Sequence, residues 1–505
     1  MSLARSISKL LGTLSSGPLR AYLDILVVGS GARVFGLASQ FVVLIMLSRF
    51  LPKQSFGDLM TAFGFYRLTG LALGIGGSLV LLFHVSRQRD DRAAEIRLQR
   101  FSALVGGIPS GAIALATVIA AGPVAATLGK PSLAIWLQQL APFVVFTTLL
   151  AIATGALEGR SRVAESIFWG DVAPSAVRIV LLPLVALLHL PSVYVAHVLT
   201  LSVLLPWLVL ARRMASRDLA GWQRWARWDY SYCGKFVVAT LFANQLGAAD
   251  IVIASLLFPS ATVADYAVAA RLAALFTFFE LALLKRFAPR AGRLLAVKDE
   301  IGLHREFDMC RRLAIGSVAV TIAGVLPMAP ILLPLLGNYL DARTPLIWLA
   351  IPSFIAAFYA TSDRLLIIAG QANVALVVTA SSFAVLMTAP FGLAPWLGPV
   401  AIPAVMILSA VLFNPIVALR ARQLIGVHTL MWRDVILIAC GCTALAAAAI
   451  AGSYASVMLV SALLAAIGAY YLTTALSQST GDDYDNSLIL AAGTAATSSL
   501  DRASK

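Results

Sequence analysis

The chain alternates between long apolar runs and short polar tracts that are mostly basic. A helix needs roughly 20 apolar residues to cross a bilayer, and runs of that length predict about fourteen transmembrane helices. The expected spans of the first half are Ile25–Ser48, Leu59–His84, Phe101–Ala121, Leu133–Leu157, Ile167–Leu188 and Ser192–Ala211. Those of the second half are Lys235–Phe258, Ala264–Leu284, Leu313–Leu336, Pro345–Ile368, Asn373–Leu393, Leu397–Leu419, Val435–Ala451 and Tyr454–Leu476. We therefore predict an all-α polytopic membrane protein with a polar, disordered tail at 477–505.

Composition supports a lipid environment. Sixty percent of the 505 residues are hydrophobic and 12% are charged, whereas soluble proteins carry about 25% charged residues. The formal charge of +14 would suggest nucleic acid, but the basic residues fall between the apolar runs. Connections on one side are rich in arginine, and the other side holds only Arg49, Lys53, Lys130 and Arg343. The positive-inside rule then predicts that both termini are cytoplasmic, in a bacterial inner membrane, with membrane lipids and no nucleic acid as partners.

Two further features of the ends and connections follow from the sequence. The first 22 residues are polar and basic and lack a cleavage pattern, so we expect the first helix to be retained. The basic connection that holds Trp222, Trp225 and Trp228 is either an interfacial amphipathic segment or ordinary positive-inside anchoring.

A faint internal repeat relates the two halves of the chain. An offset of 207 residues aligns Ser48 with Ser255, Pro52 with Pro259 and Asp58 with Asp265, and it continues through Ala62 with Ala269 and Leu68 with Leu275. Each set straddles the turn between the first two helices of its half. Two halves with a site between them are a common transporter arrangement.

Enzyme motifs are nearly absent. No Walker loop or HExxH is present, and Gly70 and Gly74 form a GxxxG that indicates close helix packing. We expect no cofactor, no bound metal and no enzymatic activity, so that any active transport would depend on an ion gradient or on flux.

The most informative residues are charges inside the spans, because a charge in hydrocarbon is costly unless it is paired or faces water. Asp265 and Asp363 lie near span ends, where interfacial anchoring explains them. The arginines that could converge in a water-accessible cavity are Arg33, Arg67, Arg178 and Arg271. Guanidinium forks match diphosphate oxygens, which predicts an anion site. The alternative is snorkelling with salt bridges to Asp250 or Glu280, and Arg178 could equally pair structurally with neighbours, as could Asp171.

Several local motifs resemble a known family. They are Leu47–Pro52 followed by Phe56-Gly57, then Asp250–Ile253 leading to Ala264–Leu272, and Pro334–Tyr339 followed by Pro345-Leu346. In these segments the chain resembles the polysaccharide-exporter (Wzx/PST-type) branch of the multidrug/oligosaccharidyl-lipid/polysaccharide (MOP) superfamily. The resemblance implies two six-helix lobes, 1–228 and 229–425, around a central cavity, with a terminal helix pair at 426–476.

The same resemblance implies a function. The implied function is that of a flippase, which moves undecaprenyl-diphosphate-linked oligosaccharide repeat units to the periplasmic leaflet. These units would be destined for exopolysaccharide, lipopolysaccharide O-antigen or capsule. Related lipid II flippases place cavity arginines on helices one, two and eight, as Arg33, Arg67 and Arg271 are placed here. They also use an acid on helix seven for cation coupling, which points to Asp250, with Glu280 as a second candidate. Their acid on helix eleven has no counterpart in 373–393, so sodium or proton coupling stays open.

Two other functions were weighed. A cation-coupled drug or metabolite antiporter of the same fold would need an acidic cavity, whereas this one is basic. A membrane-embedded polysaccharide polymerase or ligase would need a large external loop, and the longest expected here is Gly122–Ser132. A polymerase and a chain-length regulator are instead expected as partners of a flippase.

Overall fold

The computed structural model describes residues 30–87, 92–160, 162–214, 224–243, 248–426 and 431–477. Every regular element of these residues is helical, as predicted. The elements of the first half are α3 (Ser30–Phe50), α4 (Lys53–Arg87), α5 (Arg92–Thr127), α6 (Pro131–Gln139), α7 (Ala141–Gly159), α8 (Val163–Ile167), a π-helical turn (Phe168–Val172), α9 (Ala173–Leu187) and α10 (Tyr194–Met214). The predicted tail beyond Ser477, residues 1–29 and Trp222 lie outside the described residues.

The second half is also a run of helices. They are α11 (Arg227–Ala243), α12 (Asp250–Leu257), α13 (Ser260–Ala273), α14 (Phe278–Ala296), α15 (Glu300–Leu335), α16 (Arg343–Ala357), α17 (Ala360–Ile368), α18 (Ala372–Leu397), α19 (Ala401–Ile425) and α20 (Trp432–Ala451). Short 3₁₀ turns occupy Leu340–Ala342 and Gly398–Val400. A terminal helix, Tyr454–Ser477, ends the described chain.

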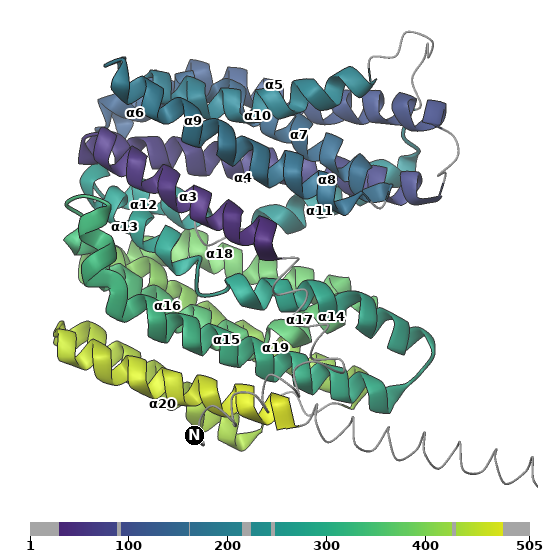
Figure 1. Cartoon of the computed structure of the whole chain (residues 1–505), viewed down its shortest axis with the longest axis vertical. Coiled ribbons are helices and arrows are strands. Elements are labelled where there is room, and N and C mark those ends of the chain that lie inside the picture. Colours follow the sequence, from purple (N-terminus) through teal and green to yellow (C-terminus); the bar gives the residue numbers. More distant parts are fainter. Residues whose placement is uncertain are drawn as a thin grey trace, which may run out of the picture.

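The helices form two lobes. Helices α3 to α10 make up one lobe, α14 to α17, α19 and α20 belong to the other, and α11, α12, α13 and α18 lie between them (Figure 1). Nine helices of the described residues, or eleven if each of two bent pairs counts as one span, are long and apolar enough to cross a membrane. The chain is therefore a multi-pass membrane protein, although this criterion does not reach the fourteen spans that we predicted.

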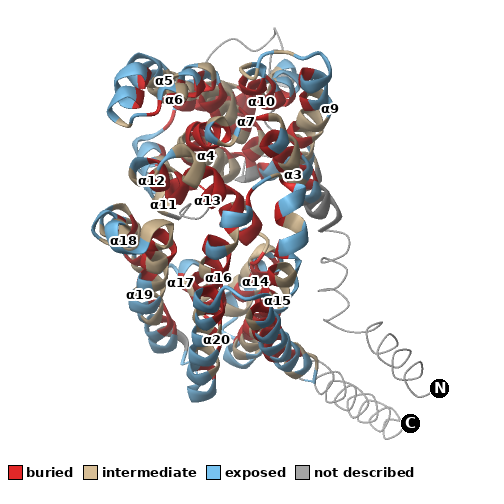
Figure 2. Ribbon diagram, turned by 90° about the vertical axis from the view of Figure 1, so that its left-hand side faces the viewer, coloured by how far each residue is buried: buried red, intermediate tan, exposed pale blue. Residues whose placement is uncertain are grey.

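Helices dominate because lipid offers the backbone no hydrogen-bond partners, so each spanning segment must satisfy its own N–H and C=O groups. Large apolar side chains are exposed on the outer faces, among them Ile119, Trp396 and Leu459. Figure 2 shows buried positions on the inward-facing sides of the helices and exposed ones outside. On a soluble monomer such a surface would be an aggregation hazard, whereas here it faces lipid.

Two predicted spans are bent rather than straight. The span Ala264–Leu284 divides into α13 and α14, which meet at a 47° bend. The span Pro345–Ile368 divides into α16 and α17 at a 46° bend. Our prediction of single helices there was wrong, because the hydropathy pattern reports burial in lipid and does not detect a change of helix direction.

Glycines bring α4 and α7 into close contact. A Cβ on Gly74 would lie 2.5 Å from that of Ala151, and one on Gly70 would lie 3.2 Å from Thr147. Gly155 of α7 reciprocates, since its Cβ would overlap Ser78 of α4. The packing role predicted for Gly70 and Gly74 is confirmed.

One end of the molecule carries the turns around Pro52, Lys130, Pro259 and Tyr339, and we call it the Pro52 end. The opposite end, which carries the arginine-rich connections, is the arginine-rich end. At the latter, Trp225 is buried against α4, α5 and α7, and its indole N–H donates to Ser102 Oγ at 3.0 Å. Since Trp225 is packed inside the protein, the interfacial interpretation is wrong for this residue. Nearby, Asp229 of α11 pairs with His84 Nε2 of α4 at 2.8 Å.

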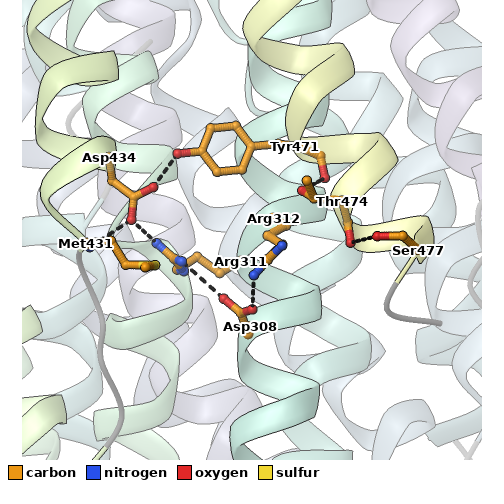
Figure 3. Close-up of polar contacts among 8 residues, drawn as sticks. All are labelled: Asp308, Arg311, Arg312, Met431, Asp434, Tyr471, Thr474 and Ser477. Atoms are coloured by element: carbon orange, nitrogen blue, oxygen red, sulfur yellow. Dashed lines mark hydrogen bonds and ion pairs between the residues drawn. The ribbon is translucent and has the colours of Figure 1, made fainter. Parts of the chain in front are cut away.

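A buried ion-pair network joins the terminal helices to α15. Arg311 of α15 is 1% exposed and donates to Asp434 of α20 at 2.8 Å and to Asp308 at 3.1 Å. Asp434 also accepts from the hydroxyl of Tyr471, which the terminal helix supplies (Figure 3). Arg311, which precedes the predicted span Leu313–Leu336, therefore belongs to a network that joins three helices.

Candidate functional site

Two arginines from different helices lie over the ring of Phe63 in α4, and a third arginine lies near them on α4 itself. The guanidinium carbon of Arg271, in α13, is 5.7 Å from the ring centroid, and that of Arg178, in α9, is 5.9 Å away. Both distances fall within cation–π range. Arg67 follows Phe63 by one turn of α4, and its charge acts on the guanidinium groups of both other arginines. We call Arg67, Arg178 and Arg271 the arginine cluster; the side chain of Arg33, in α3, lies outside the described residues.

The cluster combines residues from both halves of the chain. Arg67 and Arg178 come from α4 and α9 in the first lobe, while Arg271 comes from α13, which packs on α4 between the lobes (Figure 1). Arg178 is fixed by its own lobe, since its Nε donates to Ser202 Oγ of α10 at 2.9 Å. A ligand held by all three side chains would therefore bridge the two halves of the protein.

Two carboxylates accompany the arginines. Asp171 lies in the π-helical turn, just before Pro174, and its charge acts on Arg67. Asp250 is fully buried at the start of α12, where it accepts from the Tyr266 hydroxyl at 3.0 Å and from the backbone N–H of Ile251 at 2.8 Å. Its charge acts on Arg271. Single-turn π-helices occur frequently at functional sites.

The arginine cluster is not neutralised by direct ion pairs. Among the described residues, none of the ion pairs involves Arg67, Arg178 or Arg271. Nη2 of Arg271 is buried and has no hydrogen-bond partner in this part of the chain. The salt bridges that we considered as the alternative, to Asp250 or Glu280, are not formed between described side chains. Three like charges held together in this way favour binding of an anion.

Glu280 lies apart from the cluster. It belongs to α14, beyond the bend that separates this helix from Arg271 in α13. The charge of Arg364 acts on its buried carboxylate, which itself acts on Cys310 of α15. The two residues that we proposed for ion coupling, Asp250 and Glu280, thus occupy different surroundings. In the described part of the chain, no three His, Cys, Asp or Glu side chains are grouped to hold a metal ion.

Several contacts of the site were missed from sequence. Phe63, Ser202 and Tyr266 reach the charged groups only through the packing of helices that are distant in the chain. Asp265 was interpreted as an interfacial anchor, but it is buried and pairs with Lys53 of α4 at 2.8 Å. The sequence did contain a hint, since the internal repeat aligned Asp265 with Asp58.

Comparison of sequences identifies no relative: no protein-family model matches the chain, and no curated protein matches it. Comparison of structures finds proteins of similar fold. An inward-facing multidrug resistance MATE family transporter of the MOP superfamily superposes with a TM-score of 0.64 and 15% identity, covering 77% of this chain and 94% of the other. An outward-facing transporter of the same description superposes with a TM-score of 0.59 and 14% identity, covering 82% of this chain and 97% of the other.

A third similar structure is that of a MOP superfamily transporter from Pyrococcus furiosus, described as having a binding pocket of reverse polarity that suggests a different function. It superposes with a TM-score of 0.59 and 14% identity, covering 83% of this chain and 98% of its own. At such low identity these similarities concern the fold. The chain has the fold of the MATE family transporters of the MOP superfamily.

Proposed function

We propose that the chain is a MOP superfamily transporter that moves a lipid-linked saccharide, through its anionic diphosphate, across the inner membrane. The observation that carries the proposal is the arginine cluster, in which Arg67, Arg178 and Arg271 converge and form no ion pair with the part of the chain that the structure describes. Three arginines stand against the two carboxylates Asp171 and Asp250, so this group of side chains keeps an excess of positive charge.

The chemistry of the cluster favours a diphosphate over other ligands. Arginine stays charged at all working pH values and presents a planar fork of donors that matches phosphate oxygens. A diphosphate offers several oxygens at once, which suits guanidinium groups that approach from different helices. The resemblance to polysaccharide exporters then supports undecaprenyl diphosphate as the lipid and an oligosaccharide repeat unit as the head group.

The location of the cluster favours alternating access. Because Arg67 and Arg178 come from the first lobe and Arg271 comes from α13, between the lobes, bound diphosphate would hold α13 against the first lobe, and release would free the two to move. The positive-inside rule puts the arginine-rich end in the cytoplasm, from which the head group would enter. The multidrug transporters of this fold have been observed both inward-facing and outward-facing.

A cation-coupled drug antiporter is the second candidate, because multidrug transporters share the fold. A cationic drug would be repelled by the arginine cluster, which argues against it. Asp250, beside Arg271, would serve either function: it would balance charge in a flippase or carry a cation in an antiporter.

The test uses proteoliposomes that contain the purified protein and a fluorescent undecaprenyl-diphosphate oligosaccharide. Loss of fluorescence to a membrane-impermeant quencher reports translocation. We expect translocation by the wild type and by Arg420→Ala, an exposed matched control, and none by Arg271→Ala. Translocation by Arg271→Ala at the wild-type rate would overturn the site, and binding of cationic drugs without lipid translocation would favour the antiporter.

A further inference from the structure

The two halves of the chain meet through paired polar contacts at the Pro52 end. Asp58 of α4, which is 1% exposed, accepts from Ser260 Oγ of α13 at 2.5 Å. It also accepts from Ser132 Oγ of α6. In the other direction, Asp265 of α13 binds Lys53 Nζ of α4 at 2.8 Å. Each half thus places a buried carboxylate against the first residue of a helix in the other half.

These contacts are reciprocal under the internal repeat. The offset of 207 residues that aligns Asp58 with Asp265 also aligns Lys53 with Ser260. The pair 53–265 therefore becomes the pair 260–58 when the halves are exchanged. In an isologous, two-fold interface, a contact between two positions always occurs twice, once in each direction. The paired contacts here follow that pattern.

A glycine lies where the two helices cross. Under the same offset Gly57 corresponds to Ala264, and the two face each other: a Cβ on Gly57 would lie 3.2 Å from the backbone nitrogen of Ala264. It would also lie 1.9 Å from the carbonyl oxygen of Ser260. No side chain fits there unless the two helices separate, so the contact depends on a glycine at this position.

A second reciprocal pair flanks the first. Lys130, in the turn before α6, donates to the backbone carbonyl of Ser255 at 2.5 Å. Tyr339, in the turn before α16, donates through its hydroxyl to the carbonyl of Ser48 at 3.4 Å. Ser48 and Ser255 are equivalent under the repeat, and each is reached by a turn of the opposite half. The repeat is thus expressed in three dimensions as a symmetric closure.

We propose that Lys53, Asp58, Lys130, Ser260 and Asp265 form a reversible latch that holds the Pro52 end closed. This inference rests on the proposed function in one respect: a transported head group must pass this end. Opening would return the charged side chains of Asp58, Lys130 and Asp265 to water. The free energy of their hydration would offset the free energy of the contacts that are lost, so the closed form would be stable but could still open. Weakening one contact shifts the equilibrium towards the open form.

The experiment measures access to a cysteine behind the latch and needs no lipid-linked saccharide. Thr61→Cys, one turn beyond Gly57 in α4, is placed in a background without the four native cysteines. A membrane-impermeant maleimide is then added to right-side-out vesicles. We expect slow labelling with the latch intact, and labelling accelerated by about tenfold or more in Lys53→Gln or Asp58→Asn, because each removes one partner of a buried charged contact.

Two controls make every outcome decisive. Leu340→Cys, exposed at the Pro52 end, should be labelled equally in all backgrounds, which establishes that this end faces the reagent. Asp341→Asn removes an 85% exposed carboxylate that lies 3.7 Å from Lys53 and should leave Thr61→Cys labelling unchanged. Should Asp58→Asn fail to fold, Lys53→Gln and the wedge Gly57→Ala test the same latch. Unchanged labelling in those variants would overturn it, whatever the transport assay shows.

Discussion

The arginine cluster and the Arg311 network are two ways of placing arginine inside this protein. Arg311 is enclosed by Asp434 and Asp308, and Asp434 is in turn bonded to Tyr471 (Figure 3). Arg271 shares the ring of Phe63 with Arg178 and, unlike Arg311, forms no ion pair with a described residue. A buried charge with matched partners holds helices together, whereas converging like charges without them suit a ligand that comes and goes.

The largest expected effect is on the stability of the Arg311 network. Arg311→Ala leaves the Asp434 carboxylate buried without its main partner, and we expect a loss of about 3–5 kcal/mol in the free energy of unfolding. Thermal unfolding in detergent measures it. Arg312→Ala, whose pair with Asp308 is more exposed, should cost less than about 1 kcal/mol. The double variant Arg311→Met/Asp434→Leu should recover most of the loss, and equal costs for Arg311→Ala and Arg312→Ala would contradict this account.

Arg271→Ala should weaken ligand binding without lowering stability, in contrast to Arg311→Ala. Removing one of several converging positive charges should leave the free energy of unfolding unchanged or increased. Binding of a diphosphate lipid should weaken by about 1.5–3 kcal/mol, roughly 10- to 150-fold, which corresponds to one charge-assisted hydrogen bond. Titration of the detergent-solubilised protein measures the affinity, with Arg271→Lys expected to retain part of it. A destabilised Arg271→Ala that binds normally would make Arg271 a structural residue like Arg311.

Phe63→Leu should have a smaller effect on the same site. It removes the ring that Arg178 and Arg271 share while keeping an apolar side chain, and we expect diphosphate affinity to fall by about 0.5–2 kcal/mol. Phe65→Leu, on the same helix but with its ring edge-to-face against Tyr66, is the matched control and should bind as the wild type does. Equal affinities for the two variants would show that the ring does not position the guanidinium groups.

The smallest expected effect is a pH dependence of the latch. Burial lowers the pKa of Lys130, and the nearby Asp58 carboxylate only partly opposes this shift. Opening would restore the ordinary value of about 10.4, so the closed form binds fewer protons than the open form between the two values. Raising the pH through that window therefore favours the closed form.

Spin labels at Thr127→Cys and Leu340→Cys, both exposed at the Pro52 end, would report this shift as a larger population of the short distance at alkaline pH. Lys130→Gln should remove the dependence. A wild-type distance distribution that moves towards longer distances as the pH rises would have the wrong sign for this mechanism.

Hydropathy and charge predicted much of the architecture because both report the solvent around a segment. The apolar runs predicted an all-helical membrane protein, and Gly70 and Gly74 predicted close packing that the α4–α7 contact confirms. The bend between α13 and α14 could not be foreseen, because residues 274–277 contain neither proline nor glycine. A hydropathy window is insensitive to a change of helix direction, so the apolar run was interpreted as one span.

The same limit applied to individual charges. Sequence marked Arg67, Arg178 and Arg271 as costly in lipid, because that cost depends on the residue and its depth alone. Whether an arginine would find a carboxylate, as Arg311 does, or a shared aromatic ring, as Arg271 does, depended on which distant helices came together. Asp265 shows this most clearly: its position near a span end favoured an anchor, but the crossing of α4 and α13 buried it against Lys53. The residue type and its depth in the membrane determine whether a charged side chain needs a partner. The packing of helices that are distant in the chain determines which partner it has.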